Sequence, residues 1–376
     1  MLDFGRLTET FLDLVRIDSL SFSERAVGDY VLGTLNALRI DCREDGAAGK
    51  IKGDCGNIIA RLPGNATGQA VLFAAHLDTV GPSSGIEPVI KKGVIRSAGR
   101  KILGADDKIG VAAILEVLRA IQEKGLKHPP LTAVFTVAEE RGLLGARALD
   151  IRRIQADVGF VLDEGGPVGK IIVKAPYQDF FSCEFTGRSA HAGVEPEKGR
   201  SAVAAAARAI TGMKLGRLDE ETTANIGVID GGTAINVVPE HARIEGEARS
   251  LSTKKLASQI SRMTVACAKA ALAEKVKQKT TVSRLYDGFD LRPNHPAVVA
   301  AVAAIKATGK RPRLSSSGGG SDTNVFHARG IPAVNLSVGY ERVHSINEYL
   351  NLKEMEAAAR MTLALATNTR PPAGAG

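Results

Sequence analysis

The stretch VLFAAHLDTV, residues 71–80, indicates the fold and raises the first question about function. Its five apolar residues run directly into His76 and, two positions later, Asp78. A continuous apolar run of strand length is typical of a strand covered on both faces, as in a parallel sheet. Side chains repeat every second residue in a strand, so His76 and Asp78 should point the same way. Taken alone, the pair is better explained as a solvated strand end, because short motifs often occur by chance.

The composition is that of an ordinary globular protein. The 376 residues suffice for two domains, and 44% hydrophobic with 24% charged residues excludes a wholly disordered or collagen-like chain. The cysteines are scattered and form no CxxC pair, which indicates a reducing compartment. The N-terminus lacks a secretory pattern, and no apolar run reaches the length of a membrane span. We therefore expect a cytoplasmic protein with no membrane partner.

The net charge of +8 raises the question of a nucleic-acid partner. The lysines and arginines are dispersed, however, and the densest cluster is KVKQK at 275–279. Tryptophan is absent, tyrosines are few, and no known nucleic-acid motif is found. The charge therefore predicts a solvated surface that favours acidic substrates, and no nucleic-acid partner.

Strand-like and helix-like segments alternate along the N-terminal part of the chain. Residues 4–38 are predicted to form two helices, with Ser21 and Glu24 in capping-box positions before the second. A long helix is predicted over 106–125, because acids stand in its first turn and a glycine ends it. The predicted strands lie at 57–62, 71–75, 131–137 and 158–162. This alternation predicts an α/β domain around a mainly parallel sheet.

From about residue 174 the pattern changes. A strand, a helix, two strands, a helix and a strand follow, which is the order of the ferredoxin-like β-α-β-β-α-β unit. Near residue 291 the first pattern resumes and continues to the last helix. We therefore predict one domain formed by 1–173 and 291–376, interrupted by an inserted domain, 174–290. The C-terminal PPAGAG, 371–376, is expected to be disordered.

Polar residues stand just beyond the carboxyl ends of the predicted strands or at the start of the long helix. In open α/β sheets, ligands bind at that edge. Two histidines and several carboxylates converging there need a compensating charge, which a pair of divalent metals supplies. Imidazole and carboxylate ligands suit zinc first, with cobalt or manganese as alternatives. These residues are His76, Asp106, Glu139, Glu140, Asp163 and His344.

Glu139 and Glu140 are consecutive, so a regular strand cannot direct both to one side. One of them is expected to be a metal ligand, and the other a free carboxylate that takes a proton from a metal-activated water and passes it to a leaving amine. An acidic pair in an exposed loop is the ordinary alternative. The four other residues of the group argue against that alternative.

The sequence resembles a family of co-catalytic zinc exopeptidases and deacylases, which includes peptidase T, carboxypeptidase G, bacterial dipeptidases and succinyl-diaminopimelate desuccinylase. The resemblance extends over nearly the whole chain, and GADDK is most similar to the peptidase T branch. The motifs that carry it, in chain order, are AAHLDTV, GADDKIG, TVAEERGLLGA, VLDEGG, GRSAHAG, GGTAINVVP, SSGGGSDTNVF and VHSINEYL.

The resemblance implies two zinc ions per chain. It implies that His76 and Asp163 bind one ion, that Glu140 and His344 bind the other, and that Asp106 bridges both. It further implies that Asp78 orients the His76 ring, that Glu139 is the general base, and that the peptide bond after Asp106 is cis.

The resemblance also implies roles for residues of the inserted domain. His191 would reach the metal centre of a neighbouring subunit and help to hold the oxyanion, which predicts a homodimer formed through the insert. Asn236 would hold the scissile carbonyl, and Arg249 a substrate carboxylate. The glycine-rich loop 315–324 has backbone amides that could cradle a substrate end, and the residues singled out in it are Gly319, Gly320 and Ser321.

We therefore predict a cytoplasmic, zinc-dependent exopeptidase of peptidase T type that acts on short peptides. Its α/β catalytic domain carries a ferredoxin-like lid and dimerisation domain. An N-acyl-amino-acid deacylase or a carboxypeptidase of the same family is the nearest alternative, since one metal site serves all of these reactions. A non-catalytic peptide-binding or nucleic-acid-binding protein is the alternative from another class.

Overall fold

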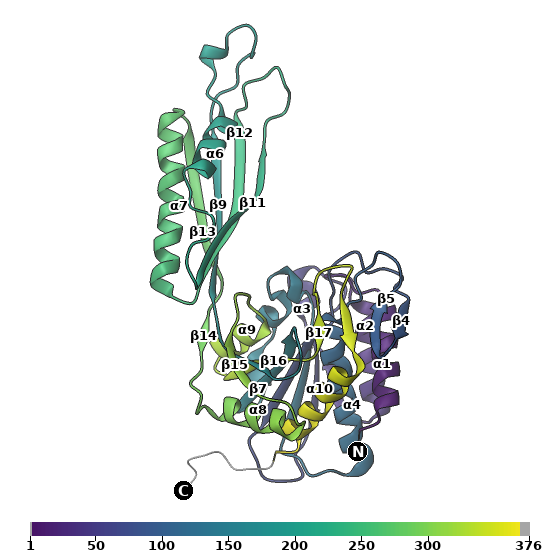
Figure 1. Ribbon diagram of the computed structural model, residues 1–376. Coiled ribbons are helices and arrows are strands. Elements are labelled where there is room, and N and C mark those ends of the chain that lie inside the picture. The colour runs from purple at the N-terminus through teal and green to yellow at the C-terminus, as the bar shows by residue number, and fades with distance from the viewer. Residues whose placement is uncertain (1, 369–376) are drawn as a thin grey trace. The chain divides into compact units, whose positions relative to one another are not determined.

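The computed structural model describes residues 2–368, and these form two compact units (Figure 1). Within the described residues, the first unit, the α/β unit, comprises 2–173, 290–316 and 321–368, and the second, the insert, comprises 174–289 together with 317–320. The expected disorder of 371–376 concerns residues outside the described part of the chain.

The α/β unit is built around one large mixed sheet. Strands β6, β3, β7 and β16 are parallel neighbours at its centre, whereas β1, β2 and β8 pair antiparallel toward its edges. The mainly parallel sheet predicted from the apolar runs is thereby confirmed. Its order is β1 (Asp41–Glu44), β2 (Ile58–Leu62), β6 (Leu131–Thr136), β3 (Val71–His76), β7 (Val158–Glu164), β16 (Ala333–Ser337), β8 (Lys170–Ala175) and β14 (Phe289–Asp290), with β15 (Arg313–Ser316) beside β8.

Helices cover both faces of this sheet (Figure 1). Helix α4 packs on β3 and β7 on one face, where α1 and α10 adjoin it. On the other face, Phe326 of α9 packs in one apolar cluster with Leu72 of β3 and Val161 of β7. The helices are α1 (Phe4–Arg16), α2 (Arg25–Ala37), α3 (Ala47–Ile51), α4 (Ala105–Lys124), α5 (Leu144–Ala148), α8 (Pro296–Ala307), α9 (Asp322–Ala328) and α10 (Leu352–Ala366).

A small antiparallel sheet in the α/β unit was not predicted. Its order is β17 (Tyr340–Glu341), β18 (Tyr349–Asn351), β5 (Val94–Ser97) and β4 (Pro88–Lys91). Strands β4 and β5 form a hairpin across Lys92 and Gly93, which both have positive φ, as a two-residue hairpin turn requires. Strand β18 places the segment after His344 beside β5.

The insert has the ferredoxin-like arrangement predicted from the order of its elements. Its sheet order is β10-β11-β12-β9-β13, antiparallel throughout, and α6 and α7 pack their apolar faces against it. The elements are β9 (Tyr177–Thr186), α6 (Ala202–Thr211), β10 (Gly216–Arg217), β11 (Thr222–Gly231), β12 (His241–Ser250), α7 (Thr253–Ala273) and β13 (Lys277–Tyr286).

The predicted capping box before α2 is wrong. Helix α2 begins at Arg25, and Ser21 donates instead to the carboxylate of Asp78, at 2.7 Å. Glu24 is completely buried, and its Oε1 accepts hydrogen bonds from the backbone N–H groups of Phe22 and Ala138. Both side chains thus form hydrogen bonds elsewhere in the fold instead of capping helix α2.

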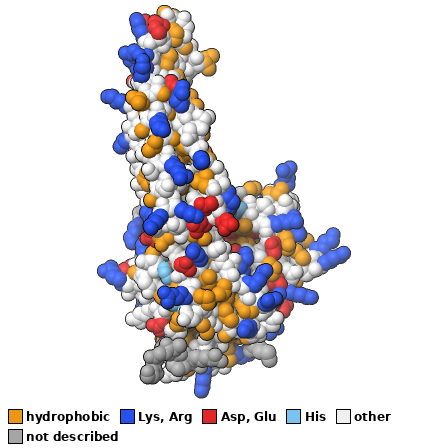
Figure 2. All heavy atoms as spheres, turned by 60° about the vertical axis from the view of Figure 1, so that its left-hand side comes forward, with side chains coloured by type: hydrophobic (Ala, Val, Ile, Leu, Met, Phe, Trp, Pro, Cys, Tyr) orange, Lys and Arg blue, Asp and Glu red, His pale blue; other side chains and the backbone are white. Residues whose placement is uncertain are grey.

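Lysine and arginine side chains are dispersed over the face shown in Figure 2, as in the sequence. Within residues 2–368, no helix is both long enough and apolar enough to cross a bilayer.

Candidate metal centre and active site

His76 closes strand β3 and is 2% exposed. Its Nδ1 lies 2.8 Å from the backbone carbonyl oxygen of Asp78 and 3.4 Å from the Asp78 carboxylate. A carbonyl oxygen only accepts hydrogen bonds, so a neutral His76 ring carries its proton on Nδ1. The lone pair of Nε2 is then available to a metal, and the backbone of Asp78 is the closer of the two groups that orient the ring.

Asp106 lies between two histidines, and each of its carboxylate oxygens faces one of them. Its Oδ1 is 3.1 Å from His76 Nε2, and its Oδ2 is 3.4 Å from His344 Nε2. Asp163 Oδ1 lies 3.7 Å from His76 Nε2, and Glu140 Oε1 lies 2.7 Å from His344 Nε2. The structure thus brings these five side chains together as two histidine–carboxylate pairs around one aspartate.

Asp106 owes its position to an irregular start of helix α4. Asp106 and Asp107 have non-helical backbone angles, and the peptide bond between them is cis. The Asp107 carboxylate accepts hydrogen bonds from the N–H groups of His76 and Gly110, at 3.2 and 3.1 Å. Asp107 therefore ties the start of α4 to the end of β3, while Asp106 remains directed at the histidines.

The electrostatics of this cluster call for a cation. Burial opposes protonation of His76, but hydrogen bonds to Asp106 and Asp163 outweigh it and raise the pKa of His76 well above its ordinary value. Hydrogen bonds to Asp106 and Glu140 raise the pKa of His344 to about 10. Histidines whose pKa values are raised in this way lie in a strongly negative environment. Divalent metals can supply the positive charge there when the two rings are neutral.

The donor set fits such metals. The ligand atoms of His76, Asp106 and Glu140 lie within 4.8 Å of one another, and so do those of His76, Asp107 and Asp163. Imidazole nitrogens with carboxylate oxygens suit zinc, cobalt or manganese.

Glu139 and Glu140 follow strand β6 in a sharp turn. Ala138 has a left-handed backbone with φ of 48°, and Glu139 opens a 3₁₀ turn, Glu139–Arg141. The N–H groups of Glu139 and Glu140 donate to Oδ1 and Oδ2 of Asp78, at 2.9 and 3.2 Å. The two glutamates therefore lie in an irregular turn, so their side chains can take different roles although they are neighbours in the sequence.

Glu139 is buried close to the cluster, with 9% of its surface exposed. Burial, and then the charge of Asp163, holds the pKa of Glu139 well above its usual range. Its neighbour Glu140 contacts His344 directly. Of the two, Glu140 has the geometry of a ligand, and Glu139 has a carboxylate with high proton affinity.

Two further side chains contact this cluster and were not predicted. Glu348 is 2% exposed, and it accepts hydrogen bonds from the N–H groups of Gly104 and Asp106, at 2.6 and 3.2 Å. Burial raises its pKa to about 7. The hydroxyl of Tyr340 donates to Asp163 Oδ1 at 3.2 Å. An acid four residues after His344 was a usable signal for Glu348, whereas Tyr340 had none.

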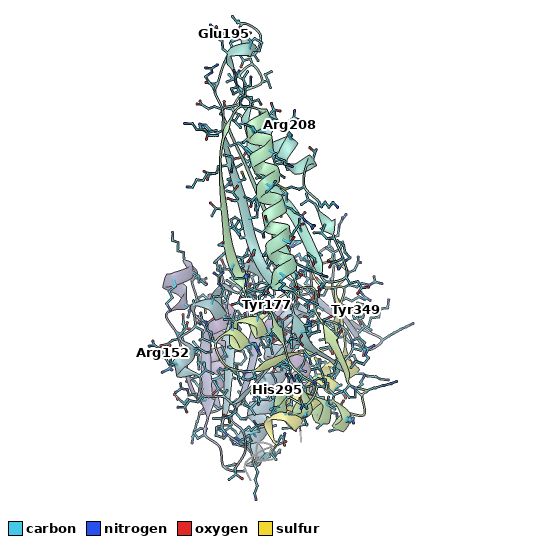
Figure 3. The ribbon with its side chains drawn as sticks, turned by 90° about the vertical axis from the view of Figure 1, so that its left-hand side faces the viewer. Arg152, Tyr177, Glu195, Arg208, His295 and Tyr349 are labelled. Carbon is cyan, nitrogen blue, oxygen red and sulfur yellow. The ribbon has the colours of Figure 1, made fainter. Side chains whose placement is uncertain are left out.

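His191 and Asn236 lie side by side in the insert. A backbone bridge joins His191 to Val237, and the N–H of Ala192 donates to the carbonyl oxygen of Asn236 at 2.9 Å. Both residues are exposed. Figure 3 shows that Glu195, four residues after His191, lies at the opposite end of the insert from Tyr177, where β9 begins.

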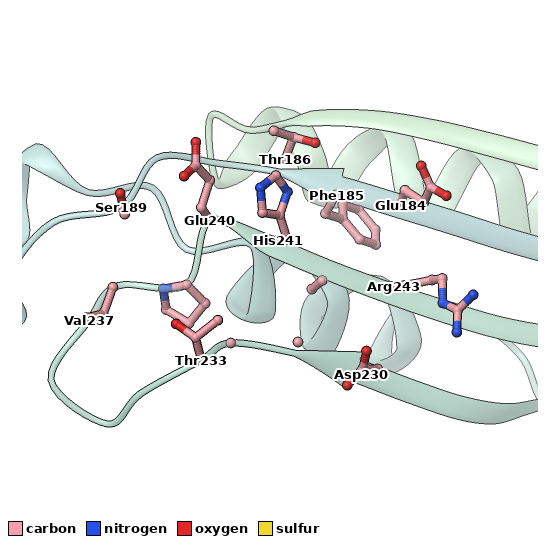
Figure 4. Close-up of a pocket in the computed structure, with 14 residues that line it drawn as sticks. Glu184, Phe185, Thr186, Ser189, Asp230, Thr233, Val237, Glu240, His241 and Arg243 are labelled. Carbon is pink, nitrogen blue, oxygen red and sulfur yellow. The ribbon is translucent and has the colours of Figure 1, made fainter.

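A pocket of about 600 Å³ adjoins these loops and is lined by residues of the insert (Figure 4). The ends of β9, β11 and β12 and the loop 232–240 enclose it. Ser189 and Val237 belong to the same two loops as His191 and Asn236, and His241, to which the sequence assigned no role, also lines the pocket. This corner of the insert is therefore hollowed.

Arg249 lies near the end of β12, and its guanidinium binds the carboxylate of Glu247 through two hydrogen bonds of 2.9 Å. Glu247 also accepts a hydrogen bond from Gln178 of β9. Arg249 is thus held in one orientation within the insert.

The glycine-rich loop approaches Arg249. A Cβ on Gly319 would lie 4.0 Å from the guanidinium of Arg249, and a Cβ on Gly320 would clash with the ring of Tyr286. Ser321 begins α9 and forms a capping box with Asn324. The close approach of backbone to side chain explains why this loop needs glycine at 320.

The layered α/β unit and its histidine–carboxylate cluster are typical of a metal-dependent hydrolase. The model of Peptidase family M20/M25/M40 matches residues 72–368. The chain therefore belongs to this peptidase family, and the expected resemblance and enzyme class are confirmed.

The chain is similar to several peptidases over nearly its whole length. The chain is 41% identical to the aminopeptidase PepT of Bacillus cereus, with a TM-score of 0.87 over 98% of this chain and 99% of that one. It is 38% identical to a tripeptidase of Staphylococcus aureus, with a TM-score of 0.92 and the same coverage. Peptidase T of Escherichia fergusonii is 24% identical over 413 residues, which cover 97% of this chain and 98% of that protein.

Proposed function

We propose that this chain is a two-metal exopeptidase of peptidase T type, which removes the amino-terminal residue of short peptides in the cytoplasm. The observation that carries the proposal is the position of Asp106, with one oxygen toward His76 and the other toward His344. A carboxylate placed in this way is suited to bridge two cations. The similarity to an aminopeptidase and a tripeptidase supports cleavage of short peptides from the amino end.

The proposed ligands are His76 and Asp163 for one metal, Glu140 and His344 for the other, and Asp106 for both. Zinc is the first choice, with cobalt and manganese as alternatives. Bound there, the metals would polarise the scissile carbonyl and make water acidic near neutral pH.

Glu139 is proposed as the general base. It accepts a proton from the attacking water and delivers that proton to the leaving amine. Its burial beside the cluster supports this role, because the carboxylate is shielded there from bulk water. Asp78 fixes the backbone of Glu139 and thereby its approach to the cluster.

The insert supplies the proposed substrate contacts. Asn236 holds the scissile carbonyl, and Arg249 binds the carboxylate of the substrate. The hydrogen bonds that Arg249 donates to Glu247 support the second role, because they hold the guanidinium in one orientation beside Gly319. Backbone amides of Gly319, Gly320 and Ser321 complete the cradle for the substrate end.

The insert is also proposed to form a homodimer through strand β11. Strand β10 pairs with this strand only at Thr223 and Ala224, and Val228 and Ile229 further along it are 43% and 56% exposed. Pairing between two copies would cover such an edge. In the dimer, His191 of each chain would donate a hydrogen bond to the oxyanion formed in the other chain.

The function is tested by identifying the products of zinc-loaded protein with matched peptides. A tripeptide of three different residues should yield its first amino acid and the remaining dipeptide, and the N-acetylated tripeptide should stay intact. Release of the carboxyl-terminal residue would favour a carboxypeptidase, and release of acetate a deacylase.

The shared site is tested by mixing variants. His191→Ala should lower kcat by about 10²–10³-fold, the scale of one oxyanion donor, while zinc content is unchanged. Mixed with Glu139→Gln subunits, it should regain part of the activity, because one centre then has an intact base and an intact partner histidine. No recovery despite confirmed subunit exchange would place His191 in its own subunit's site or outside catalysis.

A further inference from the structure

Four consecutive backbone N–H groups, from Val137 to Glu140, donate to side chains after strand β6 ends. Val137 donates to Oδ1 of Asn57 at 3.2 Å, and Ala138 donates to Oε1 of Glu24 at 2.9 Å. Glu139 and Glu140 donate to the Asp78 carboxylate. The three acceptors, Asn57, Glu24 and Asp78, are completely buried.

The carbonyl groups of the same turn are held from the other side. The N–H groups of Gly145 and Leu144 donate to the carbonyl oxygens of Val137 and Ala138, at 3.0 and 3.1 Å. Leu143 donates to the carbonyl oxygen of Glu139 at 2.8 Å. The turn therefore replaces the lost sheet partners of β6 with buried hydrogen bonds on both sides, as buried backbone requires.

Glu24 has a particular task within this set. Its Oε1 accepts hydrogen bonds from Ala138 and from Phe22, at 2.9 and 3.0 Å, and these two residues have φ of 48° and 77°. A left-handed backbone is unfavourable for alanine and phenylalanine and persists only where surroundings enforce it. One buried carboxylate oxygen thus stabilises two such conformations.

Burial, and then the negative charge of the neighbouring Asp78, raises the pKa of Glu24 to about 7. A buried lysine offsets part of this unfavourable electrostatic energy. Lys108 is 1% exposed, interacts electrostatically with both carboxylates, and donates from Nζ to Ser19 at 2.6 Å. Burying a carboxylate costs free energy, so the presence of Glu24 here points to a specific partner, which is the backbone of the turn.

We propose that Glu24 is a positioning residue for catalysis: by accepting the N–H of Ala138, it fixes the turn that directs Glu139 and Glu140 to their separate places. The inference rests on the roles proposed above for those two residues. Glu24 lies before the segment matched by the family model, 72–368, so that match assigns it nothing. Its loss should disturb turnover and the geometry of the Glu140 ligand more than substrate binding.

The test compares three variants with a matched control. Glu24→Met removes the acceptor at similar size, Glu24→Asp keeps the charge but withdraws the oxygen by one methylene, and Glu24→Gln keeps an acceptor oxygen. The control is Glu116→Met, because Glu116 is 1% exposed and also accepts a backbone N–H, that of Asp3, at 2.9 Å. The Glu116 carboxylate binds Arg6 rather than the turn.

Three measurements are made on protein reconstituted with cobalt: kcat and KM, metal content, and the visible Co²⁺ absorption spectrum. We expect Glu24→Met and Glu24→Asp to lower kcat by about 10–100-fold, the scale seen when residues that orient metal ligands are replaced. KM should change little, the Co²⁺ spectrum should shift, and Glu24→Gln should restore most of the activity. Glu116→Met should lower thermal stability without changing kcat or the spectrum.

A kcat and a spectrum of Glu24→Met equal to those of the control would overturn the proposal, as would equal losses in Glu24→Gln and Glu24→Met. If Glu24→Met does not fold, the proposal is tested by comparing kcat and the Co²⁺ spectrum of Glu24→Asp with those of Glu24→Gln. Should the parent protein cleave no peptide, the proposed function fails, and the Co²⁺ spectra still decide whether Glu24 positions the turn.

Discussion

Asp78 serves the site with both its backbone and its side chain. Its carbonyl oxygen accepts the hydrogen bond of His76, and its carboxylate accepts those of Glu139, Glu140 and Ser21. The expected role of Asp78 in orienting the His76 ring came from the family resemblance, whereas the two-residue spacing in the sequence predicted only that the two side chains point the same way. That spacing could not show that the carboxylate holds a turn that lies some sixty residues away, because that contact depends on β3 and β6 being neighbours.

The division of tasks between the two glutamates gives a prediction at this scale. Glu139→Gln keeps the size and polarity of the side chain but cannot accept a proton, so kcat should fall by roughly 10²–10⁴-fold, the usual contribution of general acid–base catalysis. Zinc content should stay near that of the parent, whereas Glu140→Gln should lose zinc. Metal analysis beside steady-state kinetics checks both, and the opposite pattern would mean that the two roles are exchanged.

At the scale of elements, apolar runs predicted the central strands well, because strands covered on both faces are apolar throughout. The hairpin of β4 and β5 was missed, since its short, half-exposed strands carry lysine and arginine among the apolar residues. The capping box failed for a different reason. Ser21 and Glu24 have the right spacing for a helix cap, but buried partners just after β3 and in the turn after β6 compete for them.

The turn after β6 gives a second prediction. A Cβ on Gly145 would clash with the carbonyl oxygen of Val137 and would lie 2.6 Å from Oδ1 of Asn57. Gly145→Ala should therefore displace the turn and lower both thermal stability and kcat, with a loss of stability of about 1–3 kcal/mol, as for overpacked sites. Thermal unfolding and kinetics measure the two effects.

Gly33→Ala is the matched control for that variant. Gly33 lies inside α2, is exposed, and has open space where a Cβ would be added. The substitution should stabilise the protein by about 0.5–1 kcal/mol, because alanine is the better helix former. An active, equally stable Gly145→Ala protein would contradict the account of the turn.

At the scale of the whole molecule, the sequence predicted the insertion of one unit into another because the order of elements changes and then resumes. The candidate ligands could be grouped because each follows a strand of one parallel sheet or enters the adjoining helix, and such ends meet at one edge. Glu24, Tyr340 and Glu348 could not be placed in this way. Their contacts depend on loops, whose paths follow no periodic pattern.

The central claim is that His76, Asp106, Glu140, Asp163 and His344 together bind two metal ions that peptide cleavage requires. The most direct measurement is metal content per chain alongside tripeptide hydrolysis, for protein stripped with a strong chelator and then titrated with zinc or cobalt. We expect stripped protein to be inactive and activity to return as the content approaches two ions per chain. Full activity in the presence of the chelator, or saturation of activity without bound metal, would contradict the claim.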